Sequence, residues 1–235
     1  MPFLFFAHWK DDSVENVPRK TPSMVSVLRN RMFYLYFAAW LMFAFVDSFE
    51  TVVVNHLLLE GSVANVDLGL MRSVEPVVAG LATVIAGAVS DWIGRKKVLI
   101  FGFVSLGIAY ATLGLLPLSW SSSWWFFFVT EGVSIGASWI LFLVVLWGDM
   151  SARSSEKYYA IGEIPFFLTG IFSLLLKDML LTIFESSSFS LASFFLFLAV
   201  VPLVLAPETL PEKRIKDREL KMYVEKAMKV KEKYA

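Results

Sequence analysis

Seven charged side chains stand inside long apolar stretches of this sequence, where an ionisable group is costly and usually functional. They are Asp47, Glu50, Arg72, Glu75, Glu131, Lys177 and Asp178. Five are acids and two are bases, and a carboxylate that lacks a basic partner in a dry site tends to hold a proton. This set therefore predicts a pathway or binding site for a proton or another cation.

The depth of each charge within its apolar stretch separates two interpretations. At about 1.5 Å of rise per helical residue, Asp47, Glu75 and Glu131 fall in the outer half of a bilayer. We expect them to converge on one polar cavity, with Arg72 and Lys177 as available partners. The alternative is that charges near the ends of their stretches extend to the lipid headgroups. It applies most readily to Glu50, Glu75, Lys177 and Asp178, and less readily to Asp47 and Glu131.

Hydrolytic and metal chemistry find little support in the sequence. It contains no cysteine, and His8 and His56 are too far apart to form a metal cluster by themselves. The stretch 132–136 matches the G-x-S-x-G nucleophile pattern, but that motif needs a strand–turn–helix elbow and this copy lies in an apolar helical stretch. We expect Gly132 and Gly136 to allow close helix packing instead. The prediction is therefore no enzyme, with no catalytic residue, no cofactor and no metal.

The apolar stretches that position these charges are long enough to cross a lipid bilayer. Hydrophobic residues make up 57% of the 235-residue chain and charged residues 18%, with a mean hydropathy of +0.65. This composition excludes a disordered chain, a nucleic-acid binder and a typical soluble enzyme. A span needs about 20 apolar residues, and no stretch alternates with a period of two. We therefore predict an all-α polytopic membrane protein with six transmembrane helices, at 32–54, 71–91, 97–117, 123–147, 159–183 and 187–206.

Basic residues outside these stretches fall on one side of the predicted membrane. All lysines and arginines except Arg72 and Lys177 lie there when both termini are cytoplasmic, as the positive-inside rule favours. Residues 1–31 then form a cytoplasmic N-terminal arm, or the remnant of a loop between two halves. Residues 32–206 form the transmembrane domain, and 207–235 a basic amphipathic cytoplasmic tail. The expected localisation is the plasma membrane, with membrane lipid as a partner.

The loop between the second and third stretches carries a pattern of glycines and charges. It reads G-x-x-x-D-x-x-G-R-K-K, formed by Gly87, Asp91, Gly94, Arg95, Lys96 and Lys97. Gly94 permits a tight turn, Asp91 can meet the positive N-terminus of an adjacent helix, and Arg95 can pair with a carboxylate. This loop resembles the signature of the major facilitator superfamily, although Trp92 stands where the family commonly has a basic residue. The plain alternative is an ordinary positive-inside loop.

Two more stretches strengthen the resemblance. Residues 207–211 read P-E-T-L-P, similar to the motif that closes a six-helix half in sugar-porter-like members, and 148–153 resemble the loop after the fourth helix. The resemblance implies one six-helix half of a major-facilitator-type fold, with the C-terminal half favoured. It also implies peripheral third and sixth helices, and these two stretches are the ones without an internal charge.

The function that the resemblance implies is secondary transport. The chain, or a transporter of which it is half, would move a small solute by alternating access with a proton or cation as coupling ion, and the loop at 87–97 would act as a gate. The expected protein partner is a second six-helix half or, in a homodimer, a second copy. The alternative is a non-transporting degenerate or scaffold membrane protein of the same fold.

Overall fold

The computed structural model describes residues 24–60, 67–150, 155–182, 185–210 and 220. Every element in these residues is a helix, and six helical segments are long and apolar enough to span a membrane. The predicted all-α class and the predicted number of spans are therefore confirmed for the described part of the chain. Residues 1–23 of the terminal arm and most of the tail lie outside the described residues.

The spans begin and end close to the predicted positions. A short helix, α1 (Met24–Leu28), precedes them. The spans are α2 (Arg31–Glu60), α3 (Leu68–Ile93), α4 (Arg95–Leu115), α5 (Ser121–Ser138) continued by the π-helix η1 (Trp139–Val145) and α6 (Leu146–Met150), α7 (Ser155–Gly162) with α8 (Ile164–Thr182), and α9 (Glu185–Leu205).

The largest boundary difference is at the end of α2, which runs to Glu60 rather than to residue 54. Asn55 and His56 interrupt the apolar run and suggested a loop there. The helix continues because Leu57 remains buried in the core and holds the last turns against their neighbours. His56 therefore lies in a helix and not in a loop.

The fifth span is broken beside its proline. Helix α7 ends at Gly162 and α8 begins at Ile164, so Pro165 lies in the first turn of α8, where the missing N–H of a proline is tolerated and its ring does not clash with a preceding helical turn. Pro76 and Pro202 instead lie inside uninterrupted helices α3 and α9. The π-helical segment η1 in the fourth span was not predicted.

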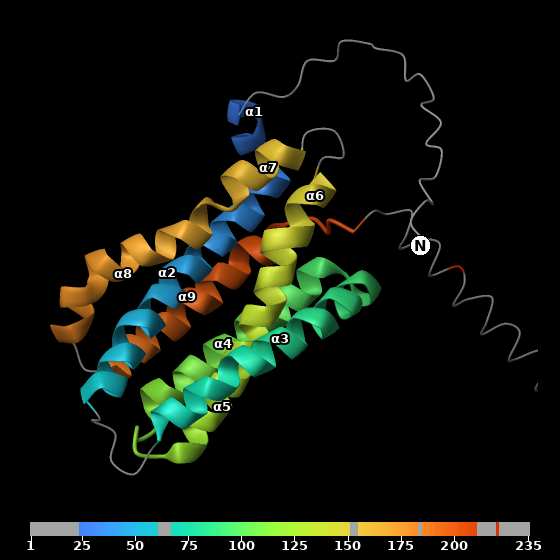
Figure 1. The fold of residues 1–235 in the computed structure, drawn as a ribbon. Coiled ribbons are helices and arrows are strands. Elements are labelled where there is room, and N and C mark those ends of the chain that lie inside the picture. The colour runs from blue at the N-terminus through green and yellow to red at the C-terminus, as the bar shows by residue number, and fades with distance from the viewer. Residues whose placement is uncertain (1–23, 61–66, 151–154, 183–184, 211–219, 221–235) are drawn as a thin grey trace, which may run out of the picture.

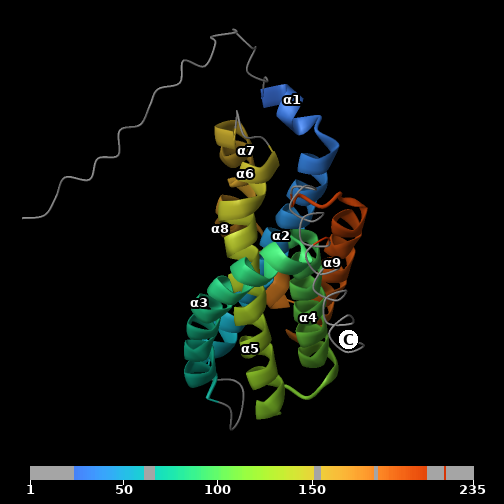
Figure 2. The same ribbon diagram turned by 90° about the vertical axis from the view of Figure 1, so that its right-hand side faces the viewer.

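The spans pack as two groups of three, α2 with α8 and α9, and α3 with α4 and α5 (Figure 1). Within the groups the principal pairings are α2 with α8, α2 with α9, α3 with α5, and α4 with α5; α4 and α9 join the groups. The first three spans are α2, α3 and α4, and the last three are α5, α8 and α9. If α2 is exchanged with α5, α3 with α8 and α4 with α9, the same set of pairings results. The bundle therefore has the packing of a three-plus-three internal repeat, and Figure 2 shows α3 and α9 on its opposite sides.

Small residues bring the helices of one group into close contact. A Cβ atom placed on Gly132 would lie 2.7 Å from the Glu75 carbonyl oxygen of α3, and one on Gly136 would lie 2.9 Å from the Thr83 backbone nitrogen. Ser134, between these glycines, donates a hydrogen bond of 2.9 Å to the Gly102 carbonyl of α4. The expected packing role of this stretch is confirmed.

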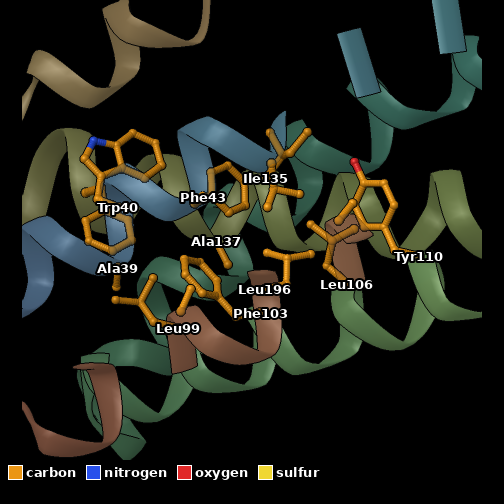
Figure 3. Close-up of a cluster of buried hydrophobic side chains, with 14 of the residues drawn as sticks. Ala39, Trp40, Phe43, Leu99, Phe103, Leu106, Tyr110, Ile135, Ala137 and Leu196 are labelled. Carbon is orange, nitrogen blue, oxygen red and sulfur yellow. The ribbon is translucent and has the colours of Figure 1, made fainter. Parts of the chain in front are cut away.

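An apolar core fills the centre of the bundle, where side chains from α2, α4, α5 and α9 meet (Figure 3). The Trp40 ring stacks on Phe142 with centroids 4.6 Å apart, and Phe43 stacks on Phe103 at 5.2 Å. These rings join the two groups of helices in the half of the bundle toward Gly94. The other half, toward Asp67, contains Arg72, Glu75 and the charges that face them.

Candidate functional site

Five of the seven predicted charges come from three helices that face one another in the half of the bundle toward Asp67. We call Asp47 and Glu50 of α2, Arg72 and Glu75 of α3, and Glu131 of α5 the charged cluster. Arg72 forms an ion pair with Glu50 across the two groups of helices and lies 3.9 Å from the Glu75 carboxylate on its own helix. The prediction that acids of the first, second and fourth spans converge is therefore consistent with the structure.

The remaining two acids of the charged cluster have no direct basic partner among the described residues. Asp47 lies within electrostatic range of Glu75 and Arg72, and the Thr169 hydroxyl of α8 is close to its carboxylate. Arg72, which was expected as a partner for Asp47, is already paired with Glu50. Asp47 is thus placed beside the ion pair without taking part in it.

Glu131 is the most deeply buried member of the charged cluster, with 1% of its surface exposed. It lies within electrostatic range of Glu75, Arg72 and Asp47, and its Oε2 atom has no hydrogen-bond partner in the part of the chain that the structure describes. The close packing at Gly132 sets this turn of α5 directly against the turn of α3 that carries Glu75. A buried polar atom without a partner carries a free-energy penalty, so this carboxylate needs a proton, a cation or a moving base.

Lys177 and Asp178 do not join the charged cluster. Both side chains are exposed on α8, and no ion pair links either of them to the cluster within the described residues. Their position near the end of the helix matches the alternative in which such charges reach the headgroups. Lys177 therefore does not supply the base that Asp47 lacks.

At the opposite end of the bundle, Gly94 forms the turn between α3 and α4. Its φ of 102° is the only positive glycine φ in the described residues, and a Cβ there would lie 2.5 Å from Oε2 of Glu208. The Glu208 carboxylate accepts hydrogen bonds from the backbone N–H groups of Arg95 at 3.0 Å and Lys96 at 3.3 Å. Glu208 thus takes the role at the helix N-terminus that was expected of Asp91.

The side chains of this loop tie several spans together. The buried Arg95 guanidinium pairs with Asp149 at the end of α6 and lies 3.5 Å from Asp91 on α3. Lys96 donates to the carbonyl oxygens of Val204 and Ala206, which end α9. We call Asp91, Arg95, Lys96, Asp149 and Glu208 the ionic knot. It joins α3, α4, α6 and α9 at one end of the bundle.

Two further loop residues play smaller parts. Lys97 is exposed, and Gly87 lies inside α3, where an added Cβ would meet Ile140 of η1 at an ordinary contact distance of 3.5 Å. Gly87 is therefore not needed for a turn, although it faces the fourth span. Beside the knot, the Tyr36 hydroxyl of α2 donates to the Pro207 carbonyl at 2.9 Å.

Sequence reasoning missed three acids. Glu208 and Asp149 both lie within stretches that carried the family resemblance, but neither was selected as a site residue. Glu163 lies at the break between α7 and α8, and its Oε1 is buried with no hydrogen-bond partner among the described residues. The signal for Glu163 was present, because an acid inside an apolar span, two residues before a proline, is itself unusual.

Within the described part of the chain, no group of three or more acidic, histidine or cysteine side chains could hold a metal ion. Comparisons with protein-family models and with curated proteins found no match for this chain. Its membrane class therefore rests on the six apolar helices, and any narrower assignment rests on the geometry of the charged cluster and the ionic knot.

Proposed function

We propose that this chain is a secondary transporter, or one half of one, that moves a small solute by alternating access with a proton or another cation as the coupling ion. The observation that carries the proposal is the charged cluster, which gathers four carboxylates and one guanidinium from α2, α3 and α5 inside an otherwise apolar bundle. A charged side chain inside a membrane span carries a large free-energy cost, and such side chains usually mark a pathway for a substrate or an ion.

The arrangement of the helices supports a major-facilitator-type half. Three-plus-three repeats nested in a six-helix half are the known architecture of that superfamily, and the packing pairs of this bundle are unchanged by the corresponding exchange. The charged cluster lies on the first, second and fourth spans, whereas α4 and α9 pack against each other and have no charge in their central turns. This division fits a cavity on one side and a peripheral pair on the other.

The ionic knot supports a gating role for the loop at Gly94. It joins helices of both groups, and the apolar core closes the same half of the bundle, so the solute path of this state would open toward Asp67. Alternation would require the Arg95–Asp149 pair and the Lys96 contacts to break. In the proposed topology this end and both termini are cytoplasmic, and the membrane is the plasma membrane.

The proposed partner is a second six-helix half or, in a homodimer, a second copy. Helices α3 and α8 bury the smallest share of their surface within the unit, while α2 buries the largest. A partner that covered α3 and α8 would enclose the charged cluster from the open side. Lipid would cover the remaining faces.

The test is transport by purified protein in proteoliposomes, alone and with any subunit that co-purifies in mild detergent. We expect solute-dependent currents across a panel of solutes, driven by a proton or cation gradient. Asp47→Asn should abolish gradient-driven accumulation and retain solute exchange, because it keeps the shape and removes the titratable group. Glu156→Gln, an exposed acid of α7 outside the cluster, is the matched control. Accumulation by Asp47→Asn with the parent's gradient dependence would show that Asp47 is only structural, and no flux in any form would refute transport.

A further inference from the structure

The charged cluster contains more negative charge than its own base can neutralise. Arg72 is engaged by Glu50, which is buried, and by Glu75 at 3.9 Å. Asp47 and Glu131 face these groups from α2 and α5 without an ion pair of their own. A surplus of carboxylates in a poorly hydrated site attracts cations and repels anions, so this charge balance already indicates the sign of the ligand.

Glu131 gives independent evidence for a missing partner. The side chain is almost completely buried, yet Oε2 accepts no hydrogen bond from any described residue. Its surroundings are aromatic, since Phe127 and Phe128 precede it by one turn on α5 and Tyr110 of α4 lies within electrostatic range. Figure 3 shows the Tyr110 hydroxyl turned away from the apolar side chains around it.

A compact metal ion is not the ligand that these acids suit. No group of three or more acidic, histidine or cysteine side chains in the described residues is placed to hold a metal. A cation with a diffuse charge and an apolar body suits carboxylates that lie beside aromatic side chains.

We propose that the carboxylates of Asp47 and Glu131 bind the ammonium group of a small organic cation, which would be the solute of the proposed transporter. The inference rests on the proposed function. Glu131 supplies the buried charge, Asp47 the charge at the open side, and Tyr110 and Phe127 the apolar wall. Arg72 neutralises Glu50 and also lies 3.9 Å from Glu75, so Asp47 and Glu131 are the two carboxylates of the cluster for which the described residues show no ion pair.

The experiment measures binding, so that it is independent of transport. Radiolabelled choline is titrated against the protein in lipid nanodiscs, with the uncharged isostere in which carbon replaces the nitrogen as one competitor and sodium as another. We expect saturable choline binding that the isostere does not displace. Glu131→Gln should weaken binding at least tenfold, because a desolvated charge pair is lost, and Glu131→Asp should restore part of it. Glu156→Gln should bind like the parent.

Asp47→Asn keeps the proposal falsifiable if Glu131→Gln fails to fold, since Asp47 is only partly buried and its loss should also weaken binding about tenfold or more. Equal binding by the parent and a folded Asp47 or Glu131 variant would overturn the proposal. So would displacement by the isostere, displacement by sodium at equal concentration, or the absence of choline binding. Transport of an uncharged solute without cation binding would leave the proposed function standing and overturn this inference. Choline binding without flux in any form would support this inference and overturn the proposed function.

Discussion

Single residues of the ionic knot take positions that few other side chains could fill. Gly94 combines a positive φ with the close approach of the Glu208 carboxylate, and Arg95 is a buried cation between two acids. The two features depend on each other, because the turn at Gly94 brings the first backbone N–H groups of α4 to Glu208. Substitutions that add or replace only one or two atoms should therefore weaken the ionic knot.

Gly94→Ala should destabilise the protein by about 1–3 kcal/mol, since alanine rarely adopts this backbone conformation and its Cβ would displace Glu208. Thermal unfolding in detergent should show a clear fall in Tm. Gly80→Ala is the control, because an added Cβ at this helical position of α3 meets nothing within 4 Å. An equal fall in Tm for Gly80→Ala and Gly94→Ala would contradict this explanation.

The two carboxylates that Arg95 contacts should differ in their contributions. Asp149→Asn leaves a buried arginine without its closest partner and should cost about 3–5 kcal/mol. Asp91→Asn removes a carboxylate that is 48% exposed and 3.5 Å away, so its effect should stay within about 1 kcal/mol. Denaturant or thermal unfolding of the two variants side by side provides the measurement. If both variants unfold alike, Asp149 is not the principal partner.

At the scale of elements, the fourth span contacts the fifth at its π-helical segment. The π-helix η1 widens the helix between Trp139 and Val145, which leaves a carbonyl oxygen free to accept from outside the helix. The Tyr159 hydroxyl of α7 donates to the Val144 carbonyl, and Gly162 at the end of α7 packs against the Trp147 ring. The π-helix and the break at Pro165 thus lie side by side.

Tyr159→Phe should loosen η1 by removing this hydrogen bond, at a cost of about 1 kcal/mol. Hydrogen–deuterium exchange should rise in peptides that cover 139–147 and remain unchanged in α4. Tyr34→Phe is the matched control, because Tyr34 is exposed on α2. Unchanged exchange in η1 would show that packing alone maintains the π-helix.

At the scale of the whole molecule, the faces of α3 and α8 remain open although the centre is tightly packed. Helix α2 is surrounded by its neighbours, whereas Val84 of α3 and Leu174 of α8 are largely exposed. In a membrane, lipid can cover such faces as well as protein can. Cross-linking separates these two possibilities.

The chain contains no cysteine, so a single introduced cysteine reports contacts without background. If a second copy covers the open faces, Val84→Cys and Leu174→Cys should form covalent dimers in membranes under mild oxidation. Phe101→Cys, exposed on α4 and outside the two open faces, should stay monomeric. Equal cross-linking at all three positions would indicate random collision, and a larger adduct would indicate a different subunit.

The sequence by itself determined the six spans and the close packing at Gly132 and Gly136. A run of about 20 apolar residues can satisfy its backbone in lipid only as a helix, and a glycine on a helix face permits close approach wherever its neighbour lies. Both are properties of short stretches of chain. The break before Pro165 has the same origin, because the proline ring acts on its own backbone.

Only the tertiary structure decided which charges meet. It paired Arg72 with Glu50, left Asp47 and Glu131 without a base, and placed Glu208 at the start of α4. Many spatial arrangements of the six helices are compatible with the same hydropathy profile. An ion pair between residues far apart in the sequence can form in only some of these arrangements. The partners of a charge therefore depend on which spans become neighbours, and that choice is made by the packing of the whole bundle.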